Sequence, residues 1–348
     1  MRSSVAAGSR LDGQYSRVTH PPEPINRQEL VSLAEIRAAA ERIRGVALRT
    51  PLLPFGDDAW IKPESLQPTG SFKIRGAYNA LAGLSAERRA AGVVTHSSGN
   101  HAQAVARAAR LLGMRAVVVM PNGAPQVKVA GVRADGAEIV FVGPANDERV
   151  ARAHEIAERD GMELVPSADD RRVICGQGTC GLEIAEQLAE LNIRPPLNVL
   201  VPVGLGGLAA GIATAVKALL PGSTLLGVEP ALAADTRASL EAGKPVRWPA
   251  EEVGRTMADG LRAESPAPLP FVHLQRLLDG VLTVAEEDIA QAVRVAASAV
   301  RLVLEPSGAV TLAALLVHRD QLTDGPTVVV ASGGNVDRQR LAELLATG

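Results

Sequence analysis

The sequence predicts an α/β protein built on parallel sheets, and three observations support this fold class. The chain has 348 residues, enough for two compact lobes with their own cores. From about residue 92 onward, short β-branched runs alternate with alanine-rich stretches of helical spacing, a rhythm typical of parallel sheets. Most of these runs are followed directly by Gly, Pro or Ser, which indicates turns that lead from a strand into a helix.

The elements follow from this pattern in chain order. Apolar residues recur with helical spacing over residues 30–43, which predicts a first helix. The expected strands are 93–95, 116–120, 138–142, 199–203, 225–228, 281–284 and 327–331. Ligands of open α/β sheets bind where the strands end. We therefore expect the functional site in the turns that follow these strands.

Composition and charge exclude several classes of partner. The formal net charge is -2, from 36 basic and 38 acidic residues that are mixed along the chain, and aromatic residues make up 2%. A nucleic-acid-binding protein would show a basic surface and stacking platforms, so we expect a small-molecule partner. The two cysteines, Cys175 and Cys180, are too few for a disulfide framework. A cytoplasmic location is expected.

Neither a membrane span nor a secretion signal is predicted. Residues 197–216 carry no charge and include Gly207 and Gly211 at a spacing found in membrane helices. Pro202 and the glycines after it would break such a helix, whereas a strand, a glycine turn and a buried helix account for the whole stretch. Residues 1–26 contain no apolar segment of signal-peptide length and are expected to be a flexible leader.

Lys73 is the first candidate for chemistry, because the chain has only five lysines. It follows the turn Thr69-Gly70-Ser71-Phe72 and is expected at the start of a helix. The positive end of the helix dipole would lower the pKa of the amine, which favours a Schiff base with a carbonyl compound. The alternative is an ordinary surface lysine on an early helical turn.

A glycine-rich loop is the second candidate. Residues 202–211 read Pro-Val-Gly-Leu-Gly-Gly-Leu-Ala-Ala-Gly, a strand end that opens into a helix. Such a loop lets backbone N–H groups surround one phosphate. A dinucleotide motif does not fit, since Ala209 replaces its third glycine, and the lysine of a P-loop is missing. Tight strand-to-helix packing is the structural alternative.

Two further polar turns complete the set. Ser97-Ser98-Gly99-Asn100-His101 follows an expected strand and begins a helix, so its N–H and hydroxyl groups suit a carboxylate. Plain helix capping is the alternative, and a Ser-His hydrolase is disfavoured because no G-x-S-x-G motif is present. Ala331-Ser332-Gly333-Gly334-Asn335 ends the last expected strand in the same way.

Together, these four segments resemble the fold type II pyridoxal-phosphate enzymes, in particular the serine/threonine dehydratase (threonine ammonia-lyase) family and its relative serine racemase. The resemblance covers about residues 36–340. Leu205 departs from the usual four-glycine loop, and Cys175 stands where alanine is usual. Further matching segments are Met120-Pro121 with Pro125 and Lys128, Gly176 to Thr179 with Glu183, Gly227 to Pro230, Ala258 to Gly260 and Glu305 to Gly308.

The resemblance implies a tryptophan synthase β-like architecture, with two open parallel-sheet α/β lobes and pyridoxal 5'-phosphate in the cleft between them. The larger, cofactor-binding lobe is expected to comprise residues 27–91 and 170–348, and the smaller lobe residues 92–169. A homodimer or homotetramer is expected. Since the Ser332 motif lies close to residue 348, no amino-acid-sensing domain is expected after it.

The resemblance also implies roles for individual residues. Lys73 would form the Schiff base and take the α-proton, and Phe72 would lie against the ring. Asn100 would contact the ring 3′-oxygen and Ser332 the pyridine nitrogen. Ser98 would be a second acid/base. The phosphate would be held by Gly204, Leu205, Gly206, Gly207 and Leu208; the substrate carboxylate by Ser97, Ser98, Asn100 and His101; and Mg²⁺ or Ca²⁺ by Glu229, Ala233 and Asp235. The structural alternative to the metal site is that Asp235 caps the following helix and Glu229 lies at a strand end.

Glu305 would face the ring or the substrate ammonium in this family. A structural role in a first helical turn is the favoured interpretation.

The implied activity is α,β-elimination from threonine or serine, giving a 2-oxo acid and ammonia. The hydroxyl of Ser332 would hold a proton on the pyridine nitrogen less firmly than a carboxylate, which favours prompt loss of the β-substituent over transamination. The alternatives are a racemase, a dehydratase of 3-hydroxyaspartate or another β-hydroxy amino acid, a β-replacement synthase and a non-catalytic carrier. Arg133 or Arg171 would be the candidates to bind a second substrate carboxylate, although an exposed, solvated arginine is the favoured interpretation of each.

Overall fold

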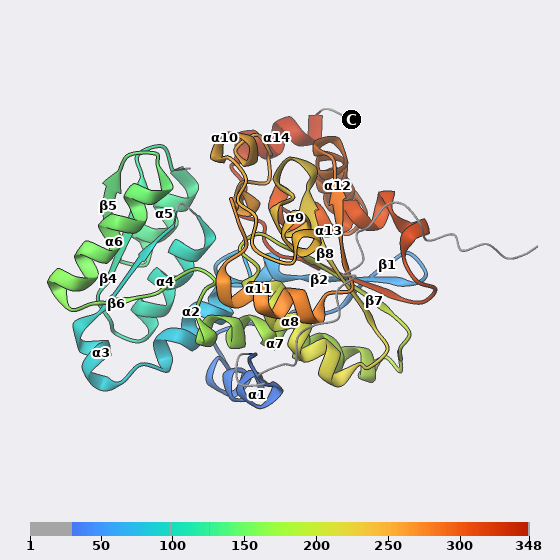
Figure 1. Ribbon diagram of the computed structural model, residues 1–348, viewed down its shortest axis with the longest axis horizontal. Coiled ribbons are helices and arrows are strands. Elements are labelled where there is room, and N and C mark those ends of the chain that lie inside the picture. The colour runs from blue at the N-terminus through green and yellow to red at the C-terminus, as the bar shows by residue number, and fades with distance from the viewer. Residues whose placement is uncertain (1–29, 98, 125, 347–348) are drawn as a thin grey trace, which may run out of the picture.

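The computed structural model describes residues 30–97, 99–124 and 126–346, and these residues form two sheets (Figure 1). The larger sheet has six strands in the order β1-β2-β10-β7-β8-β9, and the smaller has four in the order β5-β4-β3-β6. β1 pairs with β2 in the antiparallel direction, and the other pairings are parallel. The predicted α/β class with parallel sheets is confirmed.

The larger sheet combines strands from both ends of the chain. Its strands are β1 (Leu53–Phe55), β2 (Ala59–Pro63), β7 (Asn198–Pro202), β8 (Thr224–Pro230), β9 (Gly280–Val284) and β10 (Thr327–Ala331). The helices outside the smaller sheet's segment are α1 (Leu33–Arg42), α2 (Lys73–Ala82), α3 (Ala86–Ala91), α7 (Arg171–Glu190), α8 (Gly207–Leu219), α9 (Asp235–Ala242), α10 (Ala250–Val253), α11 (Pro268–Leu277), α12 (Glu286–Ala299), α13 (Pro306–Val317) and α14 (Arg338–Ala346).

The smaller sheet comes from one continuous segment, which Figure 1 shows in cyan and green at the left. Its strands are β3 (Val93–His96), β4 (Ala116–Pro121), β5 (Glu138–Val142) and β6 (Glu163–Leu164), and the helices between them are α4 (Asn100–Leu111), α5 (Gln126–Ala134) and α6 (Asn146–Asp160). The boundaries proposed for the smaller lobe, residues 92 and 169, stay a prediction, and the predicted leader 1–26 lies outside the described residues.

The expected elements are present with small shifts at their ends. Each of the seven expected strands forms, and α1 lies within the expected helix at 30–43. The stretch 197–216 folds as β7, a glycine turn and most of α8. No helix among the described residues is long and apolar enough to cross a membrane. Sequence analysis missed β1, β2 and β6, because β1 and β2 interrupt their apolar residues with proline and lysine and β6 has only two residues.

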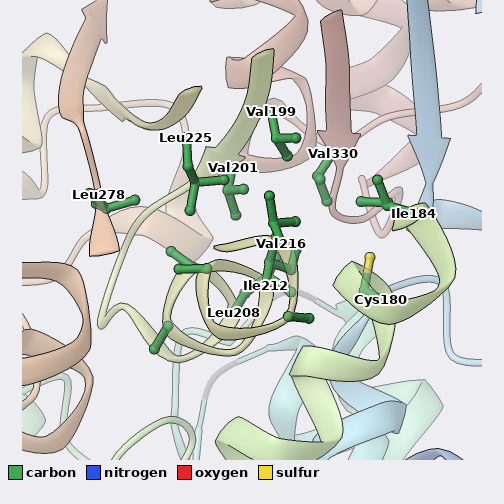
Figure 2. Packing of buried hydrophobic residues seen from close by; sticks show 14 of the residues in the cluster. Cys180, Ile184, Val199, Val201, Leu208, Ile212, Val216, Leu225, Leu278 and Val330 are labelled. Atoms are coloured by element: carbon green, nitrogen blue, oxygen red, sulfur yellow. The ribbon is translucent and has the colours of Figure 1, made fainter. Parts of the chain in front are cut away.

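Alternation along the central strands builds a core on both faces of the larger sheet. Val199 and Val201 of β7 point to one face, where they pack with α8 residues such as Ile212 (Figure 2). Leu200 points to the other face and packs in the cluster that includes Leu312 of α13. A sheet covered on both faces is typical of parallel α/β folds. The ends of its strands therefore remain as the accessible edge.

Candidate active site

Backbone contacts place Lys73 beside the end of β10. Lys73 is the first residue of α2, and the preceding Phe72 N–H donates to Ser332 O at 3.1 Å. Ser71 forms an isolated antiparallel bridge with Gly333. Two segments far apart in the sequence thus meet as an antiparallel pair of turns. This pairing brings Lys73 and Ser332 to the lining of one cavity.

Gly70 allows this close approach. Its φ is +68°, and a Cβ built there would lie 2.2 Å from Asn335 Oδ1. A left-handed backbone combined with so close a neighbour admits only glycine at low cost. Asn335 Nδ2 in turn donates to Thr69 O at 2.8 Å and to Asn100 Oδ1 at 2.9 Å. The amide of Asn335 therefore links the Lys73 turn to the start of α4.

The amine of Lys73 faces the interior of the site. Its Nζ donates to Ser167 O at 3.0 Å and lies 5.1 Å from the centroid of the Phe72 ring. Burial lowers the pKa of Lys73 to about 8, because the charged form loses hydration. About a tenth of the amine is then neutral at pH 7, far more than for an ordinary lysine, and the neutral amine is the nucleophile that attacks a carbonyl carbon.

The glycine loop joins β7 to α8. β7 ends at Pro202, and α8 begins at Gly207 after Gly206, whose φ is +93°. Among the described residues, no side chain caps this helix. Its first N–H groups thus lack the partners that a cap would provide and suit an anion. Leu205, the departure from the family loop, has a 39% exposed side chain.

These segments surround a cavity of about 180 Å³. The predicted site residues that line it are Phe72, Lys73, Ser97, Asn100, His101, Gly204, Leu205, Gly206, Gly207, Leu208 and Ser332. Residues from both sheets' strand ends contribute to the lining. Ser98, the predicted second acid/base, lies outside the described residues.

Four further polar residues line the same cavity: Lys128, Asp259, Glu305 and Ser307. Sequence analysis gave no site role to Lys128, Asp259 or Ser307, and it favoured a structural role for Glu305. Lys128 Nζ lies 2.5 Å from Asp259 Oδ2 and 3.8 Å from Glu305 Oε2. Gly260 N donates to Ser307 Oγ at 2.8 Å. All four fall in segments that carry the family resemblance. Their residue types alone do not distinguish a site residue from a structural one, since acidic residues are common in first helical turns.

Glu305 is buried at the base of the cavity. Asn100 Nδ2 donates to its Oε1 at 2.5 Å. Burial raises the pKa of Glu305 to about 7, although the nearby charge of Lys128 acts in the opposite direction. The carboxyl group therefore changes its protonation state near neutral pH.

His101 lies at the first turn of α4 and is only 2% exposed. Burial lowers its pKa to about 3, and the charge of Lys73 contributes in the same direction, so the ring is neutral at pH 7. Its Nε2 lies 3.1 Å from Val165 O and must carry the ring proton, because a carbonyl oxygen only accepts. The remaining Nδ1 offers a lone pair, which suits an N–H or O–H donor rather than a carboxylate.

The predicted metal ligands lie at the end of β8, away from the cavity lining. Thr236 N and Arg237 N each donate at 2.9 Å to the carboxylate of Glu229. The structural alternative, in which Asp235 caps α9, is wrong, since Glu229 caps this helix. Both oxygens of Asp235 are buried and accept no hydrogen bond from the described residues. Burial raises the pKa of both carboxyl groups.

Two other features are not part of this site. Cys175 is buried, and burial raises the pKa of its thiol to about 12, so it is a neutral core residue. A larger cavity of about 970 Å³ lies between α1, α7 and the end of α8. It lacks both Lys73 and the glycine loop, whereas the smaller cavity combines a reactive amine with an anion-binding helix end. The smaller cavity is therefore the candidate active site.

Comparison with known proteins agrees with this geometry. The family model "Pyridoxal-phosphate dependent enzyme" matches residues 43–333. The chain is 41% identical to an L-threonine ammonia-lyase of Geobacter sulfurreducens, over 90% of this chain and 78% of that protein. It is 38% identical to an L-threo-3-hydroxyaspartate ammonia-lyase of Pseudomonas sp, over 91% of this chain and 99% of that protein.

Solved structures show the same fold. A threonine deaminase from T.th. superposes with a TM-score of 0.83 at 44% identity, covering 88% of this chain and 99% of that one. Maize serine racemase superposes with a TM-score of 0.84 at 35% identity, covering 90% of this chain and 96% of that one.

The fold and the family match define an enzyme class that uses a phosphorylated cofactor. The chain belongs to the pyridoxal-phosphate dependent enzyme family, and its fold is the type II fold that the sequence predicts. It is an enzyme of the lyase type.

Proposed function

We propose that this enzyme is an ammonia-lyase that converts a small β-hydroxy L-amino acid, threonine or serine, to a 2-oxo acid and ammonia. The observation that carries the proposal is the convergence of the Lys73 amine, the glycine loop and Ser332 on one cavity. Relatives named L-threonine ammonia-lyase, with 41% and 38% identity over nine tenths of the chain, support the choice of reaction.

The residues present fit pyridoxal phosphate. The uncapped start of α8, with the loop from Gly204 to Leu208, would hold the phosphate. Phe72 would lie against the ring, Asn100 would contact the 3′-oxygen, and Ser332 would meet the pyridine nitrogen. The cofactor supplies an electron sink for the α-carbon of the substrate. Ser332 is 5% exposed and neutral, so it leaves this electron sink weaker than a carboxylate would.

Lys73 would carry both covalent attachment and proton transfer. Its neutral amine is the form that bonds to the cofactor carbonyl carbon. When it is not bonded to the cofactor, the Lys73 Nζ would be a base for the α-proton of the substrate. The surroundings that lower its pKa to about 8 bring it near the pH at which such a base works best.

The lining favours a substrate with a neutral side chain. Ser97 and Asn100 line the cavity and would hold the α-carboxylate, together with Ser98. His101 would orient a donor group through Nδ1. Neither Arg133 nor Arg171 lines the cavity, and Arg171 pairs with Glu35 at 2.6 Å. Lys128 is already paired with Asp259. The charges of the described lining therefore favour threonine or serine over 3-hydroxyaspartate.

Incubation of the cofactor-loaded enzyme with L-threonine tests the proposal. We expect 2-oxobutanoate and ammonia in equal amounts, and we expect Lys73→Ala to lose both this activity and the Schiff-base absorption band. Full activity in Lys73→Ala would overturn the active site. A loaded, spectrally normal enzyme that releases no oxo acid from threonine or serine would overturn the reaction and leave the cofactor assignment standing.

Racemisation is a second candidate function, because the chain is 34% identical to a serine racemase of Schizosaccharomyces pombe over 90% of its length. It would need an acid/base on the ring face opposite Lys73, the role proposed for Ser98. If both L-serine and D-serine exchange their α-hydrogen for deuterium in deuterated water, racemisation would be supported. Exchange from L-serine alone would exclude it.

A divalent cation, Mg²⁺ or Ca²⁺, is proposed at Glu229 and Asp235, with the carbonyl oxygen of Ala233. The support is the pair of unpartnered, buried oxygens of Asp235, a hard-oxygen set that such ions prefer. No cluster of three His, Cys, Asp or Glu side chains occurs among the described residues, so the site would need water ligands. Adding Mg²⁺ to EDTA-treated enzyme should raise the melting temperature. An unchanged melting temperature and activity would remove the metal proposal.

We also propose that the enzyme is a cytoplasmic homodimer or homotetramer. Leu48, 50% exposed, lines the large cavity beside α1 and α7, and a second copy of the chain would cover it. Light scattering coupled to gel filtration measures the state, and a monomer would contradict this proposal.

A further inference from the structure

Four charged side chains form a buried cluster beside the start of α2, which we call the α2 ion cluster: Lys62, Glu64, Arg75 and Glu183. The side chains of Lys62, Glu64 and Arg75 are 0% exposed, and that of Glu183 is 15% exposed. Two positive and two negative charges balance within the cluster. None of the four lines the active-site cavity, so the proposed function gives them no role.

Arg75 is the centre of the cluster. Its guanidinium donates to both oxygens of Glu64, at 2.7 and 2.8 Å, and to both oxygens of Glu183, at 2.6 and 2.8 Å. It also donates to Thr179 Oγ1 at 3.1 Å and to Leu48 O at 3.0 Å. A planar guanidinium bound in two forks has one allowed orientation. The backbone of α2 at Arg75 is therefore fixed against α7 and against the segments that carry Leu48 and Glu64.

Lys62 closes the cluster from the end of β2. Its Nζ donates to Glu183 Oε2 and to Thr50 O, both at 2.6 Å, and to Gln187 Oε1 at 3.0 Å. Burial alone would raise the pKa of Glu64, but the charge and hydrogen bonds of Arg75 outweigh it and lower this pKa overall. Glu64 is thus ionised beside Arg75, and the hydrogen bonds of the cluster tie β2 and α2 to α7.

The cluster is better explained by placement than by stability. Replacing a buried ion network with well-packed apolar residues is often neutral or stabilising, so stability alone does not require four buried charges here. What the network does supply is a fixed position for α2. Helices α2 and α7 also touch at a glycine, since a Cβ at Gly76 would lie 2.5 Å from Gln177 Nε2. Lys73 lies only two residues before Arg75.

We infer that Arg75 is a positioning residue: through Glu64 and Glu183 it fixes the N-terminus of α2, and thereby the reach of the Lys73 amine into the site. This inference rests on the proposed function, in which Lys73 bonds to the cofactor. The cluster acts through the helix backbone and touches neither substrate nor cofactor.

Arg75→Lys tests the inference, because it keeps the charge and removes the two forks. Two quantities are measured: the rate at which the apoenzyme gains the Schiff-base band when pyridoxal phosphate is added, across pH, and kcat and KM for L-threonine. We expect a displaced lysine to slow band formation and to lower kcat by about 10²-fold, with KM within about threefold of the parent value. The pH midpoint of band formation should also shift.

Arg107→Lys is the matched control. Arg107 lies on α4, which begins at Asn100, and pairs with Asp135 at 3.2 Å on the partly exposed side of that helix. We expect this variant to keep the parent values of kcat and of the pH midpoint. An Arg75→Lys enzyme that is as folded as the parent and keeps both values would overturn the inference.

Two further variants keep the inference testable if Arg75→Lys does not fold. The double variant Glu64→Gln/Arg75→Gln removes one charge of each sign and leaves the Lys62–Glu183 pair. The single variant Glu183→Gln changes only the partly exposed member of the cluster. Each should lower kcat with KM nearly unchanged, and parent kcat in a folded variant would contradict the inference. Lys73→Ala separates the two proposals: if it retains the band the proposed function fails, whereas if only the Arg75 variants behave as the parent, only the positioning role fails.

Discussion

Asn100 donates a hydrogen bond from Nδ2 to Glu305 Oε1 at 2.5 Å, although the two residues are 205 positions apart in the chain. Asn100 begins α4, which packs on the smaller sheet, and Glu305 precedes α13, which packs on the larger one. Asn335 holds the other end of the same amide through Asn100 Oδ1 at 2.9 Å. The candidate site is therefore shared between the two sheets.

The first prediction concerns the raised pKa of Glu305, about 7 against an ordinary 4.5. A folded-state pKa above the unfolded value gives stability that is complete below pH 4.5 and is lost as the pH rises through 7. The full effect is roughly 3 kcal/mol. We expect Glu305→Gln, which is neutral at every pH, to flatten the fall of the melting temperature between pH 5 and pH 8. Glu87→Gln, at an exposed site, should keep the parent slope, and an equal slope in Glu305→Gln would contradict the prediction.

The second prediction concerns Gly206 in the glycine loop. A Cβ there would lie 2.9 Å from Leu274 Cδ1 and 3.0 Å from Pro270 Cβ, at a φ of +93°. We expect Gly206→Ala to lower the free energy of unfolding by about 2–4 kcal/mol, from backbone strain and overpacking, and to weaken cofactor binding. Gly113→Ala is the control, since Gly113 has φ +65° and open space around it. An equal loss of unfolding free energy in Gly206→Ala and Gly113→Ala would show that the loop does not need this close packing.

The third prediction concerns the ionisation of Lys73. Because its pKa lies at about 8, the neutral amine becomes more abundant as the pH rises through that value. We expect the rate of cofactor attachment to the apoenzyme to increase from pH 6 to pH 9 with a midpoint near pH 8, and stopped-flow absorbance measures it. A midpoint above pH 10, the range of an ordinary lysine, would refute the lowered pKa.

The fourth prediction concerns the Lys128–Asp259 pair between α5 and the segment after α10. Lys128 is 4% exposed and Asp259 36% exposed. We expect Asp259→Asn to lower the free energy of unfolding by about 1–2 kcal/mol, less than for a fully buried pair because water reaches Asp259. Asp58→Asn breaks the exposed Arg319–Asp58 pair and should change it by less than about 0.5 kcal/mol. Denaturant unfolding compares the two, and similar values would contradict this ranking.

Much of the fold could be predicted because the signal is local. The run Thr-Val-Val-Val-Ala predicts β10, and the glycine loop predicts the start of α8. β2 could not be predicted, since Lys62 and Pro63 read as solvent-exposed loop residues. The buried charge of Lys62 is paired with Glu183, 121 residues later in the chain. No local pattern carries such a partner.

In the candidate site, too, local features could be predicted and features that depend on distant residues could not. Lys73 and the glycine loop could be predicted because neighbouring residues in the sequence determine turns and helix starts. Glu305 was taken for a structural residue, because its place in the cavity depends on Asn100 and Lys128 from the other sheet. The structural alternative to the metal site made Asp235 the cap of α9, whereas Glu229 caps this helix from the end of β8. Side chains that act across a fold escape a local interpretation.

The place of β10 has a consequence for the order in which the protein can assemble. β10 lies between β2 and β7 and hydrogen-bonds to both, so the strands made first and the strands made midway have no direct pairing with each other. Until residue 331 has left the ribosome, β1 and β2 on one side and β7 to β9 on the other cannot pair into one sheet. The smaller sheet, from one continuous segment, has its strands much earlier. Synthesis from the N-terminus would thus yield a finished small lobe beside a large lobe that closes last, in one late step.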